Sequence, residues 1–124
     1  MWRFYNPNPI ASRVGDCTVR AISKAMKMGW EDTYLNLAIY GLMRSDMPSA
    51  NTVWGAYLKD KGFKRHLIPD GCCECTVKEF ANAHPTGTFI LALSGHVVCV
   101  EDGCYYDTWD SGDMTPIYYW TQEE

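Results

Sequence analysis

The chain contains the stretch Val97-Val98-Cys99-Val100-Glu101-Asp102-Gly103-Cys104-Tyr105-Tyr106-Asp107, which predicts a β-hairpin. The central pair, Asp102-Gly103, is a strong signal for a two-residue turn, because both residue types tolerate the positive φ angles that such turns require. A two-residue turn pairs Glu101 with Cys104. The strands on either side of the turn are therefore expected to be antiparallel neighbours in one sheet.

The register of this hairpin predicts which polar side chains meet. Counting outward from the turn sets Val98 opposite Asp107 and His96 opposite Trp109. Side chains on one face recur every second residue, so His96 and Asp107 share a face as diagonal neighbours within reach of a polar contact. Asp110 points to the other face if the strand stays regular. A bulge would shift the register by one residue and undo this assignment.

The remaining periodicity predicts an α+β fold, with a helical N-terminal half packed on a C-terminal antiparallel sheet. The lead-in over 1–14 is expected to be irregular, because the run Asn6-Pro7-Asn8-Pro9 cannot continue a helix or a central strand. Helices are predicted from Cys17 to just before Gly29, over 31–43 and 51–59, and from the capping box at Thr76 to Ala83; strands are predicted over 63–68 and 88–93 and, as a last edge strand, over 117–120.

Length, charge and hydropathy narrow the class of protein. One domain over 1–124 is expected for a chain of 124 residues, of which 47% are hydrophobic. The net charge of −4 and the lack of a Lys/Arg cluster argue against nucleic acid as a partner. No apolar run reaches the roughly 18 residues of a membrane helix, and the first residues lack a signal-peptide pattern, so a cytoplasmic protein is expected. The sequence does not predict an oligomeric state.

The chain has six cysteines, and a reducing compartment predicts that most of them are free thiols. The segment Gly71-Cys72-Cys73-Glu74-Cys75 has the C-x-x-C spacing of zinc sites and redox pairs. A zinc site needs about two more ligands, and the hairpin would point Cys99 and Cys104 to opposite faces. We therefore expect no metal and no cofactor, with a zinc-binding module or a Cys72/Cys75 redox pair as alternatives.

Cys17 is the cysteine best placed for reactivity. It follows Asp16, a favoured N-cap residue, at the start of the first predicted helix. The unpaired N–H groups and the dipole of a helix start lower a thiol pKa. Arg20, one turn further on, could pair with Asp16. The alternative is that Cys17 is a small buried hydrophobe, but together with His96 and Asp107 it would form a thiol nucleophile site.

Three motifs resemble those of the papain-like cysteine peptidases, a superfamily that includes papain and the bacteriocin-processing peptidases. Gly15-Asp16-Cys17 is similar to the family's Gly-Ser-Cys, Gly95-His96-Val97-Val98 to its histidine strand, and Asp107-Thr108-Trp109 to its Asn-Ser-Trp. The resemblance implies a single papain-like domain that cleaves a peptide or another amide, including one on a host protein. It assigns Cys17 as nucleophile, His96 as general base and then acid, and Asp107 as the group that orients the ring.

One position departs from the family pattern. The family usually has a glutamine about six residues before the cysteine as an oxyanion donor, and Ala11 stands there in this chain. Asn8, or Asn6, could supply a donor together with the backbone N–H of Cys17, if the proline-rich segment folds back. Asn8 could equally be a turn residue. The alternative function is a papain-like binding or inhibitory protein with little or no turnover.

Overall fold

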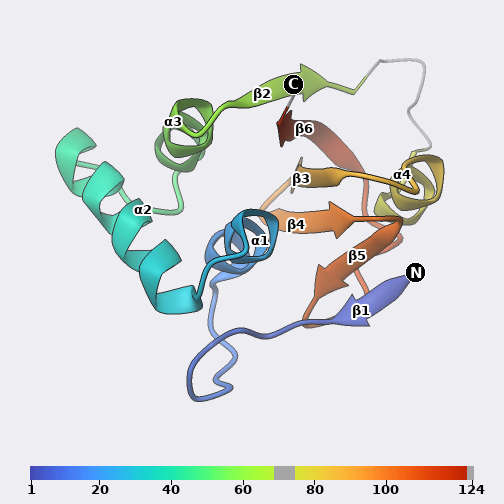
Figure 1. Ribbon diagram of the computed structural model, residues 1–124, viewed down its shortest axis with the longest axis horizontal. Coiled ribbons are helices and arrows are strands. Elements are labelled where there is room, and N and C mark those ends of the chain that lie inside the picture. Colours follow the sequence, from blue (N-terminus) through green and yellow to red (C-terminus); the bar gives the residue numbers. More distant parts are fainter. Residues whose placement is uncertain (69–74, 123–124) are drawn as a thin grey trace.

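The computed structural model describes residues 1–68 and 75–122, and these form a mixed α+β fold (Figure 1). Six strands make one sheet in the order β1-β5-β4-β3-β6-β2. The strands are β1 (Trp2–Phe4), β2 (Phe63–Leu67), β3 (Thr88–Leu93), β4 (His96–Glu101), β5 (Cys104–Asp107) and β6 (Pro116–Gln122). The helices are α1 (Cys17–Met26), α2 (Trp30–Arg44), α3 (Asn51–Asp60) and α4 (Val77–Ala83).

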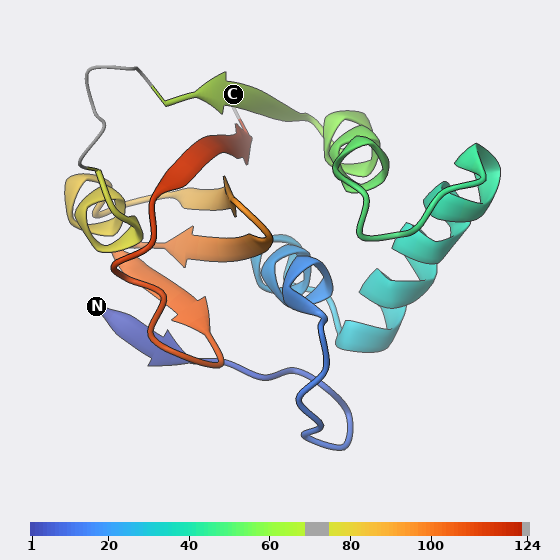
Figure 2. The same cartoon turned by 180° about the vertical axis from the view of Figure 1, so that it is seen from behind.

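Helices cover both faces of the central strands. In β3, Ile90 packs into the core formed with α1 and α3, whereas Leu91 packs into the core formed with α4. The same alternation holds in β4, where Cys99 faces α1 and Val100 faces α4. Because both faces are buried, these strands consist of nearly continuous apolar residues. Figures 1 and 2 show α2 on the far side of α1 from the sheet, whereas α3 lies beside β2.

The ends of the sheet differ from the prediction. The lead-in is not wholly irregular, because β1 pairs with β5 in parallel, which makes the sheet mixed rather than antiparallel. The C-terminal strand β6 is not an edge, since it lies between β3 and β2. All three residues of β1 are exposed, so they carry no alternation of buried and exposed positions that could have signalled a strand. The predicted turn at Pro69-Asp70-Gly71 lies outside the described residues.

The predicted turn between β4 and β5 is present. Asp102 and Gly103 have φ angles of 50° and 82°, and Glu101 pairs with Cys104 on either side of them. This combination is typical of the two-residue turn with positive φ at both central positions. The capping box is also confirmed, with reciprocal hydrogen bonds between Thr76 and Glu79 at the start of α4. Local turn and cap chemistry was therefore readable from the sequence.

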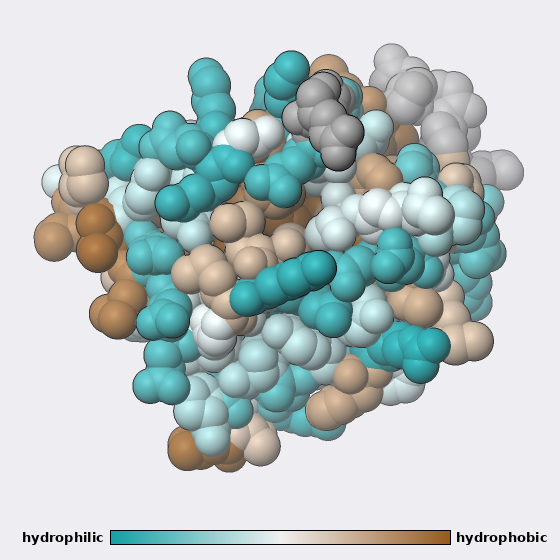
Figure 3. Space-filling view, in the orientation of Figure 1, coloured by the Kyte–Doolittle hydropathy of each residue, from teal (hydrophilic) through white to brown (hydrophobic). Residues whose placement is uncertain are grey.

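The apolar side of α2 does not face the core. The helix buries Thr33, Leu37 and Gly41, and an added Cβ at Gly41 would lie 2.7 Å from the carbonyl oxygen of Asp46. The apolar residues whose spacing predicts this helix remain largely exposed. They include Leu35, Ile39 and Leu42, whose exposed fractions are 58%, 53% and 80%. Figure 3 shows an apolar patch at the left of the molecule, where α2 lies. The close approach of the next loop at Gly41 thus fixes which side of α2 is buried.

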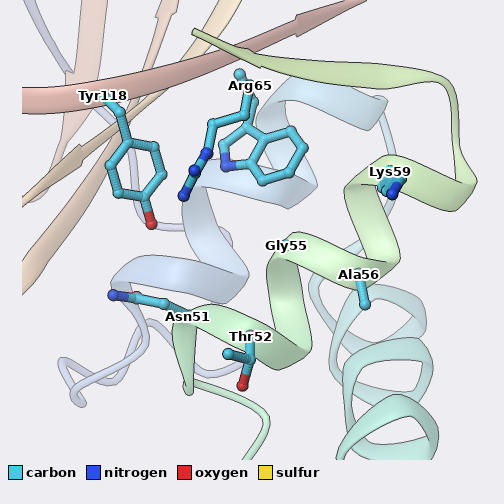
Figure 4. Close-up of a pocket in the computed structure, with 8 residues that line it drawn as sticks. Asn51, Thr52, Gly55, Ala56, Lys59, Arg65 and Tyr118 are labelled. Atoms are coloured by element: carbon cyan, nitrogen blue, oxygen red, sulfur yellow. The ribbon is translucent and has the colours of Figure 1, made fainter. Parts of the chain in front are cut away.

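A surface hollow of about 320 Å³ lies between α3 and strands β2 and β6 (Figure 4). Arg65 lies over the ring of Tyr118, with the guanidinium carbon 5.2 Å from the ring centroid. Gly55 and Ala56 form the helical wall. The lining includes none of the residues predicted to carry chemistry. Along the described helices, no segment combines the length and the apolar character that crossing a membrane requires.

The β4–β5 turn yields a stability prediction. Gly103→Val should lower the free energy of unfolding by about 1–2 kcal/mol, because a β-branched residue is strained at positive φ. Gly103→Asn is the matched control, since asparagine tolerates this conformation. Urea unfolding followed by circular dichroism measures both variants. Equal losses in the two variants would contradict the assigned turn geometry.

Candidate active site

Cys17 is the first residue of α1, directly after the N-cap residue Asp16. The carboxylate of Asp16 makes no capping hydrogen bond. It instead accepts hydrogen bonds from Arg20 Nη1 at 2.5 Å and from Trp30 Nε1 at 2.8 Å. The predicted cap position is therefore confirmed, but its side chain holds Arg20. The thiol lies where the unpaired N–H groups and dipole of the helix favour negative charge.

His96 and Asp107 meet as the hairpin register predicts. His96 begins β4 and Asp107 ends β5. The ring N–H at Nε2 of His96 donates to Oδ2 of Asp107 over 2.5 Å. The His96 side chain is 11% exposed and the Asp107 side chain 1%. The contact uses one ring nitrogen and leaves Nδ1 for another partner.

Cys17 is that partner, and the two groups shift each other's pKa. Burial by itself would raise the pKa of the Cys17 thiol, but the hydrogen bond and charge of His96, the N–H of Val97 and the charge of Arg20 lower it overall. Burial would lower the pKa of His96, but hydrogen bonds with Asp107 and Cys17 raise it to about 9. Both shifts favour a thiolate at the sulfur and an imidazolium at the ring.

The pairing of β4 with β5 ends before it reaches His96, and this leaves space for the contact between Cys17 and His96. The strands pair from Glu101 with Cys104 to Cys99 with Tyr106, and the pairing goes no further toward the start of β4. The edge of β4 near Val97 is therefore open to α1, and its backbone N–H bonds the Cys17 sulfur. A helix start thus reaches the strand that carries the imidazole.

Asp107 is held ionised by four donors. Its Oδ1 accepts hydrogen bonds from Arg20 Nη2 at 2.9 Å and from the N–H of Thr108 at 2.8 Å. Its Oδ2 accepts from His96 and, at 2.8 Å, from the hydroxyl of Ser111. Burial would raise the pKa of Asp107, but the hydrogen bonds from His96 and Ser111, the His96 charge and the Thr108 N–H lower it overall. A carboxylate with several donors stays charged well below neutral pH.

Arg20 joins the two acidic residues inside the protein. It is 6% exposed and contacts Asp16 with one guanidinium nitrogen and Asp107 with another. One cation between two carboxylates leaves a net charge of −1 beside the ring of His96. This excess charge favours the protonated form of His96. The predicted pair of Arg20 with Asp16 is therefore confirmed, but it is buried, and Arg20 also acts on the site through Asp107.

Trp109 covers the histidine. Its ring centroid lies 5.2 Å from that of His96, with the two planes at 43°. The side chain is itself 44% exposed, so one side meets solvent and the other meets the imidazole. Limiting the access of water to the ring strengthens the interaction between His96 and Asp107. The rings of His96 and Trp109 are in contact, but the pairing of β4 with β5 stops at Cys99 and Tyr106, so the predicted opposition of these two residues is not part of the sheet.

The side chains of Asn6 and Asn8 form hydrogen bonds within the loop that precedes α1. Asn8 Oδ1 accepts hydrogen bonds from the N–H groups of Ile10 and Ser12 at 3.0 and 3.2 Å. The side-chain amide of Asn6 donates to the carbonyls of Ala11 and Ser12. Asn8 thus has the turn role that the Asn-Pro pattern allowed. The unpaired backbone N–H groups at the start of α1, where Cys17 lies, remain as donors.

Among the described residues, the other cysteines do not share this environment. Cys17, Cys99 and Cys104 are free thiols, but Cys75 is disulfide-bonded, so the expectation of free thiols fails for Cys75. Burial raises the pKa of Cys99 far above the ordinary range, which makes this thiol unreactive. Cys72 and Cys73 lie outside the described residues. Within residues 1–68 and 75–122, no group of three or more histidine, cysteine, aspartate or glutamate residues is placed to hold a metal ion.

Comparisons of the chain with protein-family models, with curated proteins and with solved structures found no match. The papain-like interpretation therefore depends on the three short motifs and on the geometry of their side chains.

Three contacts of the site were not predicted from the sequence: those of Ser111 and Arg20 with Asp107, and that of the Val97 backbone with Cys17. Ser111 gives no signal beyond its place in the Asp110-Ser111-Gly112 turn. The sequence did offer a signal for the burial of Arg20, because its neighbours Val19 and Ala21 belong to the apolar residues of α1. The Val97 contact could not be read, since it uses the backbone.

The ion network yields a stability prediction. Arg20→Met should lower the free energy of unfolding by about 3–5 kcal/mol, because Asp16 and Asp107 would remain buried without their cation. Arg44→Met is the matched control, since Arg44 is exposed at the end of α2, and should change it by less than about 0.5 kcal/mol. Urea unfolding measures both. Losses of similar size would mean that Arg20 is not part of a buried network.

The histidine yields a pH prediction. An NMR titration should show His96 losing its ring proton at about pH 9, and Asp107→Asn should lower this pKa. Because the folded-state pKa exceeds the unfolded value of about 6.5, the stability contributed by His96 is fully present below that value. It is lost as the pH rises through about 9. A His96 signal that titrates near the ordinary pKa would contradict the proposed charge state.

Proposed function

We propose that this protein is a papain-like cysteine peptidase or amidase. The observation that carries the proposal is the convergence of Cys17, His96 and Asp107, from a helix start and two adjacent strands. The pKa of Cys17 is lowered and that of His96 is raised to about 9, as a thiolate–imidazolium pair requires. A thiolate beside an imidazolium that a carboxylate orients is the arrangement used for nucleophilic attack on carbonyl carbon.

The reaction follows from these positions. The Cys17 thiolate attacks the carbonyl carbon and forms a C–S bond, while the negative charge on the oxygen is stabilised by the backbone N–H of Cys17 at the helix start. His96 gives its proton to the leaving amine as the C–N bond breaks. Water then attacks the thioester and loses its proton to His96. The C–S bond breaks, and the thiolate–imidazolium pair is restored.

The substrate proposed is a peptide or other amide, including one on a host protein, and the proposed place of action is the cytoplasm. Nucleic acid is not proposed as a partner, because the chain carries a net charge of −4.

A second candidate is a binding protein with the same fold and little turnover. The observation that favours it is the local engagement of Asn8, whose side-chain oxygen accepts two backbone hydrogen bonds within its own loop. An oxyanion site that lacks one donor has a barrier higher by about 2.7–4 kcal/mol. The two candidates share the Cys17–His96 pair and differ in whether Cys17 cleaves an amide bond at an appreciable rate.

Alkylation tests the reactive pair. Iodoacetamide should label Cys17 well below the ordinary thiol pKa of about 8.5, and His96→Gln should slow this labelling about tenfold or more at neutral pH, because the hydrogen bond and the positive charge are lost. Peptide mass spectrometry separates Cys17 from the free thiol of Cys104, which serves as internal reference. If His96→Gln leaves the Cys17 rate unchanged, the assigned pair is wrong.

Turnover separates the two candidates. Peptide mixtures incubated with the protein should show new termini that are absent with Cys17→Ala. A binding protein would react with iodoacetamide at Cys17 yet produce no cleavage. An equal set of termini with the wild type and with Cys17→Ala would exclude the proposed hydrolysis.

A further inference from the structure

The hollow between α3 and strands β2 and β6 adjoins a second hollow at the start of β2. The two have volumes of about 320 and 450 Å³. Lys59, Arg65 and Trp120 line both of them, so we treat the two as one joined hollow. None of the three residues of the candidate active site lines either part. The joined hollow is therefore separate from that site, and its occupant does not depend on the proposed function.

The strand register brings a cation of β2 and an indole of β6 together. Arg65 lies opposite Trp120 in the antiparallel pair of β2 with β6. Residues directly opposite each other on two such strands share a face of the sheet. This face is the one that α3 covers, because Trp120 belongs to the core formed with α1 and α3. An added Cβ at Gly55 would lie 3.2 Å from Cζ2 of Trp120, so the helix contacts the indole closely and holds it in place.

The indole N–H of Trp120 is a buried donor that has no hydrogen-bond partner among the described residues. The residue is 8% exposed, and its Nε1 is buried without an acceptor. A buried donor without an acceptor destabilises the fold, because it has lost its hydration and gained nothing in return. An oxygen atom supplied by a ligand in the hollow would satisfy this donor. The indole thus points to an occupant that carries acceptors.

Arg65 is held by aromatic rings and not by a carboxylate. Its guanidinium carbon lies 5.2 Å from the ring centroid of Tyr118, and Tyr118 is stacked on Trp54 with centroids 6.4 Å apart. Figure 4 shows Arg65 beside Tyr118, with both side chains extending from the strands into the hollow. The ion pairs of the described residues include neither Arg65 nor Lys59. The N–H groups of both cations therefore remain for a ligand.

The rest of the lining adds donors and no negative charge. Among the described residues, no aspartate or glutamate lines either part of the hollow. Asp60, the only acid of α3, accepts a hydrogen bond from the hydroxyl of Tyr40 in α2 at 2.6 Å. Oδ1 of Asn51 accepts from Nε1 of Trp54 at 3.1 Å, which leaves the NH₂ group of Asn51 as a donor. A lining of cations and neutral donors suits an anion with several oxygens.

We propose that the joined hollow binds a doubly charged phosphate group, with Lys59 and Arg65 as its cations and Nε1 of Trp120 as a neutral donor. Two cations match the charge of a dianion. The donors come from a helix and two strands, and a tetrahedral phosphate presents oxygens in several directions, whereas a carboxylate presents two in one plane. Pockets for small molecules have volumes of roughly 300–1,000 Å³, so the phosphate is a free ion or part of a small organic ester.

The indole N–H signals in ¹H–¹⁵N NMR spectra test this site, and Trp120→Phe identifies the Trp120 signal among those of the five tryptophans. Inorganic phosphate at pH 8 and constant ionic strength should move the Trp120 signal in a saturable way. Arg65→Gln and Lys59→Gln should each weaken the affinity about tenfold, because each removes a charge-assisted hydrogen bond. Phenyl phosphate distinguishes the two sources of the group. Binding tighter than that of inorganic phosphate assigns an organic ester, and binding no tighter assigns the free ion.

Arg44→Gln is the matched control, since Arg44 also lies over a tyrosine ring, that of Tyr40, but lines neither part of the hollow. This variant should keep the phosphate affinity of the wild type. A Trp120 signal that phosphate leaves in place would overturn the proposal. An affinity that Arg65→Gln and Lys59→Gln leave unchanged, or that Arg44→Gln lowers equally, would overturn it as well.

Discussion

The ion pair between Arg20 and Asp107 connects the two halves of the chain. Arg20 lies in the first helix and Asp107 at the end of β5, and the guanidinium and carboxylate are 2.9 Å apart with almost no exposure. Placing these charges in the interior is costly unless each is paired. The structure meets this requirement with Asp16 on the far side of Arg20 and with His96 and Ser111 on the far side of Asp107.

Asp107 is tied to the N-terminal segment by its backbone as well. Its carbonyl oxygen accepts a hydrogen bond from the N–H of Tyr5 at 3.0 Å and another from Trp2 Nε1 at 3.1 Å. The parallel strand β1 is therefore anchored at the residue that also orients His96. Because rigid neighbours hold a side chain in one position, the edge strand contributes to the geometry of the candidate site. The loop that follows β1 then leads to Cys17.

Much of this arrangement could be read from local sequence chemistry. The pair Asp102-Gly103 predicts the hairpin register, and this register predicts that His96 and Asp107 share a face. The apolar spacing and the capping box at Thr76 predicted the helices. What local patterns could not supply were contacts between distant segments. The pairing of β1 with β5, the burial of Arg20 and the exposed apolar side of α2 all depend on tertiary neighbours, the last on the close approach at Gly41.

We infer that the buried network of Arg20, Asp107 and His96 sets the charge on Cys17. A titration of the thiolate by its ultraviolet absorbance, taken as the difference between the wild type and Cys17→Ala, measures this charge directly. We expect the thiolate to form below the ordinary thiol pKa, and the titration to move to higher pH when Asp107 is replaced by Asn. A thiolate that forms only near the ordinary pKa of about 8.5, or a titration that the Asp107 substitution leaves unchanged, would contradict this inference.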